Sequence, residues 1–510
     1  MEWLAGARIA LTPRPVQRRV AALEVAMLGH CPGRVRRERL LALTAALEDM
    51  RDAGFGFAVE ALVSGNMPGG APLSARLTGL FHLPIPLRSS AEFHDIFPDA
   101  ANGTAAYVSL LAGDRAWLAQ AVDDFFSNGG EKLWLVRIPE DEGQRGFLPT
   151  DDTRLHDTET LRGLATLLVI PTLAVVALPD LERLQIPPQL PDIPRVRLEN
   201  PDPRFLPCDT DTDDDHRERR YSSELPEMPE PTPLEQVLRG ILPLISRHRP
   251  DLQCLFTLPL AYSSEIGSPV ADQAALDLLT AICDGESGHL LRHLQCLFPY
   301  LRGAGTRLQS PVGVIAGKQA AVAAAKGPWH SMAALPLRSA SLPYPRLSAA
   351  QTLALRDQPG IGVLTTRTGF DGRAQLSLDD ERLIVPALPP ADYTGAEERR
   401  RLDGFRAAEI MRFLGFLRRQ LQALGEQLVF NADVNDPRPR LLLEQFFRRL
   451  YNQGALRGRV PEEGYRITQS QPQEGAIQFD IQIAPAFPID RLFLTFVNLD
   501  GEWRAELNDG

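Results

Sequence analysis

FFSNGGEKLWLVRI occupies residues 125–138 and joins the end of one predicted helix to the start of a predicted strand. Apolar residues from Trp117 to Phe126 recur at helical spacing. Gly129 and Gly130 end that helix, because glycine accepts the left-handed geometry of a C-terminal cap. The apolar run 133–138 then predicts a compact strand. A helix followed directly by a strand indicates one unit of an α/β layer.

Regular elements are predicted on both sides of this unit. The pattern predicts helices over 37–51, 233–246, 271–283 and 402–424, and another from Asp436 to near Gly454. Strict alternation predicts a strand over 477–483, followed by strands over 492–497 and 502–507 that are joined at Asp500-Gly501. The most apolar stretch, 164–178, is interrupted by Pro171 and is shorter than the roughly 20 residues of a membrane span. We interpret it as two buried pieces of a core.

Composition excludes some classes of function. A formal net charge of −11 disfavours a nucleic-acid binder, since phosphate binding requires a basic surface. The 5 cysteines are odd in number and scattered, which is typical of free thiols in a reducing compartment. The first ten residues lack the pattern of a signal peptide. We therefore expect a chain made in the cytoplasm, with no direct membrane contact.

Several motifs could be taken for chemical sites, and we expect none of them to be one. The segment 313–318 has the wrong glycine spacing for a phosphate loop and is expected to be a turn packed in the core. His289, His293 and Cys296 could bind zinc, but leucines surround them. The aspartate run 209–215 lacks the glycine and glutamate of a calcium loop. Two further polar groups have no partner that would activate them for catalysis: Ser222 with Ser223, and the triplet Asp379-Asp380-Glu381. The sequence thus predicts no catalytic, cofactor or metal site.

A set of short motifs, in order from about residue 88 to 497, resembles the contractile tail sheath proteins of phages and phage-tail-like injection systems. These motifs are SSAEF (89–93), FFSNGG with LWLVRI (125–138), LFPYL (297–301), PVGVIAG (311–317), GPW (327–329), FN with ND (430–436), GALRG (454–458), EGY (463–465) and IAPAFP (483–488). The family's PGVYVEE opening is not recognisable, and GIGVLTTRT (360–368) replaces its GI-x-VWGARTL motif. The chain therefore resembles a divergent sheath paralogue.

The resemblance implies a mixed α/β, multidomain fold. A chain of 510 residues also exceeds one compact core. We expect 1–84 to form an N-terminal arm and part of a core domain. An α/β domain is expected to be inserted over 85–344 and to carry an exposed acidic, proline-rich excursion over 184–233. Residues 345–510 would complete the core sheath domain and end in a terminal β arm, 477–507.

The resemblance also implies a structural role and not an enzymatic one. A sheath subunit would stack in hexameric rings around an inner tube and contract to drive that tube through a target envelope. Its partners would be identical or paralogous sheath subunits, the inner tube protein, and baseplate and cap proteins. The rivals are a sheath-like baseplate or cap adaptor that does not contract, and a soluble enzyme with an unrecognised site. By the same resemblance, the finished particle would be released from the cell.

The final strands are the predicted subunit interface. In the resembling family, this position supplies a strand to the next subunit, where main-chain hydrogen bonds connect the two. The expected interface residues are Leu492, Leu494, Phe496, Val497 and Trp503. Because the chain continues beyond Asp500-Gly501, an alternative is that the arm folds back and closes the subunit's own sheet.

Overall fold

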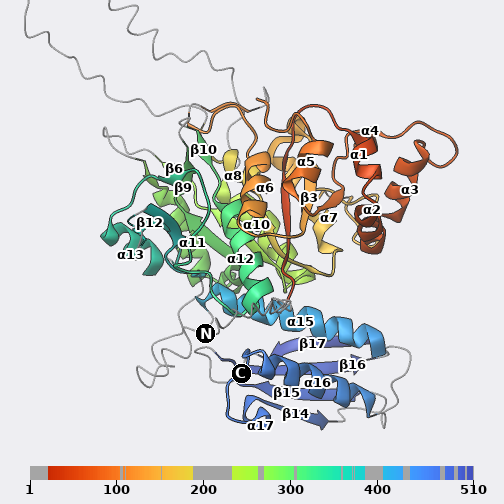
Figure 1. Cartoon of the computed structure of the whole chain (residues 1–510), viewed down its shortest axis with the longest axis vertical. Coiled ribbons are helices and arrows are strands. Elements are labelled where there is room, and N and C mark those ends of the chain that lie inside the picture. The colour runs from red at the N-terminus through yellow and green to blue at the C-terminus, as the bar shows by residue number, and fades with distance from the viewer. Residues whose placement is uncertain are drawn as a thin grey trace, which may run out of the picture.

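The computed structural model shows a large unit and a small unit, with the small unit, drawn in blue, below the large one (Figure 1). It describes residues 21–103, 107–109, 111–150, 152–187, 233–261, 269–303, 307–357, 360–369, 372, 374–384, 406–428, 437–470, 477–486, 492–499 and 502–508.

The large unit is built on an 8-stranded sheet with the order β13-β12-β8-β5-β4-β1-β3-β2. The strands from β12 to β3 in that order are parallel, and the two edge strands are antiparallel to their neighbours. The strands are β1 (Glu24–His30), β2 (Pro84–Leu87), β3 (Leu133–Ile138), β4 (Leu173–Ala177), β5 (Gln253–Thr257), β8 (Leu294–Phe298), β12 (Gly362–Thr368) and β13 (Ala374–Leu378).

The central strands are apolar on both faces, and every residue of β3, β4, β5 and β8 is buried. Parallel sheets with such strands need helices on both faces. The helices of this unit are α1 (Arg37–Leu41), α2 (Thr44–Met50), α3 (Gly56–Ser64), α4 (Ala75–Thr78), α5 (Ser90–Ile96), α6 (Leu118–Ser127), α7 (Ala165–Leu168), α8 (Pro179–Arg183), α10 (Leu234–His248), α11 (Gln273–Asp284), α12 (Val312–Lys326) and α13 (Ala349–Asp357).

Shorter elements complete the large unit. These are the π turn η1 (Arg51–Phe55), the 3₁₀ helices η2 (Glu140–Phe147) and η4 (Gly288–His293), a small sheet of β9 (Tyr300–Arg302), β10 (Leu308–Gln309) and β11 (Leu342–Tyr344), and the pair β6 (Leu260–Ala261) and β7 (Val270–Ala271).

Glycines let α6 and α12 pack very closely. A Cβ added at Gly313 would lie 2.3 Å from the carbonyl oxygen of Ala121, and one at Gly317 would lie 2.2 Å from that of Phe125. Both distances are far below van der Waals contact, so only glycine fits. The segment 313–318 therefore lies within a helix that packs in the core. The expectation of a packed turn was right about burial and wrong about the local conformation.

The small unit is a four-stranded antiparallel sheet with the order β14-β15-β16-β17. Its strands are β14 (Tyr465–Ser470), β15 (Ile477–Ile483), β16 (Leu492–Leu499) and β17 (Glu502–Asn508), and its helices are α15 (Ala408–Leu428), α16 (Arg438–Asn452) and α17 (Pro461–Gly464). Burial alternates strictly along β15, as its sequence predicts. The inward residues pack with apolar side chains of α15 and α16 in one core.

The expected domain boundaries do not coincide with these units. Strand β1 lies between β3 and β4, and β12 pairs with β8, so one sheet takes strands from both sides of 84/85 and of 344/345. The expected division into 1–84, 85–344 and 345–510 is corrected to a large unit ending at Ile384 and a small unit beginning near Ala408. The reason is physical, because a parallel strand can pair with a strand that is distant in sequence.

Most predicted elements are confirmed. The helix and strand of 114–138 are α6 and β3, and 164–178 supplies the buried α7 and β4. The predicted helix over 37–51 is divided into α1, α2 and η1. The expected N-terminal arm up to Val20 and the excursion over 188–232 lie outside the described residues. Within the described part of the chain, no helix has the length and apolarity needed to cross a bilayer.

Candidate assembly interface

The two main sheets differ in how their edge strands are covered. In the large sheet, edge strand β2 carries Pro84 and Pro86, which cannot donate to a new strand. The outer edge of β13 already accepts hydrogen bonds from the N–H groups of Ala334 and Leu337. Among the described residues, no strand pairs with the outer side of β14 or β17. Helix α15 packs along β17, and Arg418 Nε donates a hydrogen bond to the carbonyl oxygen of Ala505, so β14 offers the edge that is open to strand addition.

The predicted interface strands lie inside this sheet. Strand β16 pairs with β15 on one side and with β17 on the other. The side chains of Leu494 and Phe496 are buried in the core of the small unit, and that of Val497 is half-buried. Leu492 and Trp503 contribute backbone pairing to Ile483 and Asn498, and their side chains lie outside the described residues.

In the isolated chain, the hairpin thus closes the subunit's own sheet, which was the alternative left open above. A single chain does not test contacts between chains. The interface role of Leu492, Leu494, Phe496, Val497 and Trp503 therefore stays a prediction.

Helix α15 attaches the small unit to the large one. Its apolar face, which includes Phe413 and Leu417, packs into the small unit. Its opposite face packs against the segment Pro250 to Gln253, which leads into β5. The polar face of α15 contacts this segment, His293 and Glu381, and we call this contact the joint. At its centre, a Cβ on Gly415 would lie 2.5 Å from the carbonyl oxygen of Asp251, so the helix backbone touches the loop.

One end of the joint is a buried ion pair. The Nη1 and Nη2 atoms of Arg412 lie 2.8 and 3.0 Å from the two carboxylate oxygens of Glu381. Glu381 also accepts hydrogen bonds from Gln319 Nε2, Ser331 Oγ and the N–H of Met332. Burial alone would raise the pKa of Glu381, but the Arg412 charge and the hydrogen bonds from Arg412, Met332 and Gln319 together outweigh it and hold the pKa below its usual range. Both carboxylate oxygens of Glu381 therefore accept hydrogen bonds in addition to those from Arg412.

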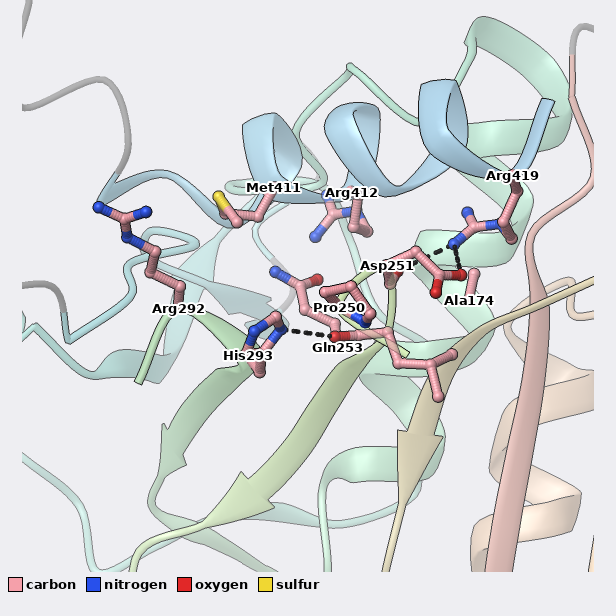
Figure 2. Close-up of a pocket in the computed structure, with 10 residues that line it drawn as sticks. Ala174, Pro250, Asp251, Gln253, Arg292, His293, Met411, Arg412 and Arg419 are labelled. Carbon is pink, nitrogen blue, oxygen red and sulfur yellow. Dashed lines mark hydrogen bonds and ion pairs between the residues drawn. The ribbon is translucent and has the colours of Figure 1, made fainter. Parts of the chain in front are cut away.

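The other end is a second ion pair. Arg419 donates to the carbonyl and the carboxylate of Asp251, at 2.9 and 3.2 Å. Arg249 also binds the Asp251 carboxylate. Burial would raise the pKa of Asp251, but these two guanidinium groups lower it. Figure 2 shows Arg412 and Arg419 extending from the same helix, α15, toward Asp251 and Gln253.

A small cavity lies within the joint. It is lined by residues from both units, among them Asp251, Gln253, His293, Arg412 and Arg419, and its volume is about 10 Å³. That volume holds at most one water molecule. The cavity therefore cannot receive a substrate or cofactor, and the joint is a mechanical contact.

With this geometry in view, the whole chain can be compared with known proteins. No protein-family model matches it, and no curated protein matches its sequence. Solved structures do match. A chain of the anti-feeding prophage (AFP) helical sheath in its contracted state superposes with a TM-score of 0.50 and 14% identity, covering 96% of this chain and 98% of that one. A chain of the AFP baseplate, 6-fold symmetrised, gives 0.50 and 14%, with 96% and 97% covered.

The chain has the tail sheath fold. A sheath tail protein from Desulfitobacterium hafniense also superposes, with a TM-score of 0.46, 8% identity and coverage of 97% and 100%. The resemblance found in the sequence motifs is thereby confirmed, as is the mixed α/β, multidomain class. The near-complete coverage includes both the large and the small unit.

The sheath-like motifs occupy structural positions in this fold. FFSNGG ends α6, where Gly129 has a φ of +94°. PVGVIAG begins α12, whose glycines contact α6. Trp329 of GPW is buried against Phe413 of α15, with ring centroids 5.6 Å apart. These three motifs therefore specify packing or a turn.

The residues considered for metal binding are not brought together. His293 is buried and bonds to the carbonyl of Leu252, whereas His289 is exposed and bonds to that of Glu286. Cys296 lies in β8, and burial raises the pKa of its thiol to about 12. Among the described residues, no group of His, Cys, Asp and Glu could hold a metal ion. The runs at Asp209–Asp215 and Ser222-Ser223 lie outside the described residues.

The usual ligand position of an α/β sheet is filled by a side chain. Ligands commonly bind at the carboxyl ends of neighbouring strands whose connections leave in opposite directions, here β1 and β4. The Asp180 carboxylate, just after β4, accepts hydrogen bonds from the N–H groups of His30, Trp117 and Leu118. It therefore occupies the N-terminus of α6, where an anionic ligand would otherwise bind.

Sequence reasoning missed the joint. Arg412 and Arg419 lie away from the apolar stripe of their helix, and they face the large unit instead of water. Glu381 was seen only as part of an acidic triplet. One signal was available: Arg412, Gly415 and Arg419 follow helical spacing, and a glycine between two arginines on one face indicates a close contact.

Proposed function

We propose that the chain is a structural sheath subunit that assembles in stacked hexameric rings around an inner tube and contracts to drive it through a target envelope. The observation that carries this proposal is the superposition on a chain of the contracted AFP sheath, which spans almost all of both chains. The partners would be further copies or paralogous sheath subunits, the inner tube protein, and baseplate and cap proteins. Nucleic acid and membrane would not be direct partners.

Two features of the geometry support this role. A contracting sheath needs rigid subunits whose connections survive a change of angle between them. The joint holds the two units together through buried ion pairs and backbone contact. The open edge of β14 could accept a neighbour's strand, and main-chain hydrogen bonds would then link subunits while leaving their relative angle free. Residues 492–503 would support this connection through their pairing in the same sheet.

We further propose that the chain is not an enzyme. Asp180 fills the ligand position of the large sheet, and the joint cavity is too small for a substrate. Assembly would occur in the cytoplasm, and the finished particle would act outside the producing cell.

A second candidate is a sheath-like adaptor of the baseplate or cap that does not contract. It is favoured by the equally good superposition on a chain of the AFP baseplate. The absence of the family's N-terminal motif also favours it. The two candidates share a fold and differ in how far the assembly propagates.

Co-expression with the inner tube protein, followed by electron microscopy, tests both. A contracting sheath gives long striated tubes, whereas an adaptor gives single rings or plugs. Monomers that do not bind the tube protein would contradict both candidates and favour the remaining alternative, a soluble enzyme with an unrecognised site. Expression without the tube protein is the control for non-specific aggregation.

A further inference from the structure

Among the described residues, two groups in or beside the joint can change charge near neutral pH: Glu409 at the start of α15, whose pKa burial and the Glu381 charge raise to about 7, and His293. This residue ends η4 just before β8, and its side chain is buried and lines the joint cavity beside Gln253 (Figure 2). Its Nδ1 atom lies 3.2 Å from the carbonyl oxygen of Leu252. Since a carbonyl only accepts, Nδ1 carries the proton, and the neutral ring has an unprotonated Nε2.

A second proton would enter a positive environment. Arg412, Arg418 and Arg419 face the site from α15, and Arg292 adjoins His293 on its own helix. The carboxylate facing it is Asp251, which already binds Arg249 and Arg419. Glu381 lies at the far end of the joint, bound to Arg412. Protonated His293 would thus add a charge where the available carboxylates already have partners.

We propose that the joint is an acid-released catch: protonation of His293 loosens α15, and with it the small unit, from the large unit. Above neutral pH the catch holds, because the neutral imidazole bonds to Leu252 and leaves the two arginine–carboxylate pairs undisturbed. In acid, the imidazolium repels the arginines of α15. This property belongs to the single chain and does not depend on the proposed assembly.

The pH window follows from the direction of the shift. Burial lowers the pKa of His293, Arg418 and Arg292 lower it further, and the Leu252 carbonyl and Asp251 oppose them only partly. A histidine whose folded pKa is lowered contributes stability that is present above its unfolded pKa of about 6.5 and is lost as pH falls below it. At pH 5.5, one unit below that value, the lost stability increases the equilibrium constant for opening of the joint by at most about tenfold.

Hydrogen exchange of the full-length chain at pH 7.5 and 5.5, corrected for intrinsic rates, tests the catch. We expect protection of the α15 amides to fall by up to about tenfold at pH 5.5, while the amides of β3 keep theirs. Any pH dependence from protonation of Glu409 has the opposite sign, and His293→Gln, which cannot take up the charge, should abolish the loss. His289→Gln, at the exposed histidine of the same short helix, should leave it unchanged.

Two results would overturn the proposal. The first is an equal loss of α15 protection in the wild type and in His293→Gln, and the second is a loss of protection in β3 as large as that in α15. If His293→Gln does not fold, Arg292→Gln replaces it as the test. Removing that neighbouring positive charge raises the pKa of folded His293, so the loss of α15 protection should be smaller at the lowest pH at which β3 stays protected, whereas an equal or larger loss would contradict the catch.

Discussion

Arg412 of α15 and Glu381 of the large unit form a two-pronged ion pair, with N···O distances of 2.8 and 3.0 Å, and their side chains are only 3% and 0% exposed. Neither charge could remain at this depth without the other. This pair is one of the contacts that fix the small unit on the large one, together with the pair of Arg419 and Asp251.

Breaking this pair should be costly. Arg412→Met leaves the Glu381 carboxylate buried without its counter-charge, and we expect a loss of about 3–5 kcal/mol in the free energy of unfolding, measured in urea. Arg382→Met is the matched control, because its pair with Asp380 is partly exposed and should be worth less than about 1 kcal/mol. Similar losses in both variants would contradict the central role of the buried pair.

The contact between α6 and α12 should tolerate no side chain. Gly317→Ala places a Cβ 2.2 Å from the Phe125 carbonyl oxygen, so the helices must separate, at a cost of about 1–3 kcal/mol. Gly56→Ala is the control, because a Cβ there meets nothing within 4 Å and should stabilise α3 by roughly 0.5–1 kcal/mol. Thermal unfolding of the two variants should show shifts of opposite sign.

Glu409, at the start of α15, should weaken the protein at high pH. Burial raises its pKa to about 7, and the nearby Glu381 charge adds to the effect. A raised folded pKa means that this stability is fully present below the unfolded pKa, about 4.3, and is lost as pH rises through about 7. Glu409→Gln should therefore stabilise the chain at pH 8 by about 1–2 kcal/mol, since partial exposure screens the full effect. An equal gain at pH 4 would show that charge is not the cause.

Adjacent prolines can test strand addition at β14. Successive residues of a strand direct their N–H groups to opposite sides, so of Thr468→Pro and Gln469→Pro one disrupts pairing with β15 and the other alters only the outer edge. The edge variant should fold with unchanged circular dichroism but form no rings or tubes in electron micrographs. If that variant assembles normally, β14 is not the connecting edge.

Removing residues 488–510 should unfold the small unit. The truncation deletes Leu494 and Phe496, which are buried against α15 and α16, and exposes the inner edge of β15. The large unit should keep its own melting transition, because its core is separate. Calorimetry should therefore show one transition retained and one lost. A fully cooperative, intact truncated chain would instead indicate that the final strands are dispensable for the fold and available to a neighbour.

The sequence alone predicted the mixed α/β class, most helices and strands, and the tail sheath resemblance, because these depend on local signals. Apolar spacing along 402–424 identifies α15 wherever it packs, and alternation along 477–483 identifies β15. Glycines such as Gly129 mark helix ends through their own backbone preference.

Only the tertiary structure decided where the units divide, that β16 and β17 close the chain's own sheet, and that α15 is held by Glu381 and Asp251. A parallel strand carries no signal naming its neighbour, so β1 could not be placed between β3 and β4 from sequence. The sequence places an arginine on the polar face of a helix and does not show whether its side chain contacts water or a buried carboxylate. Arg419 contacts the carboxylate of Asp251, 168 positions away. Periodicity records which face of an element is apolar, and the partner of each face is fixed only when distant segments pack together.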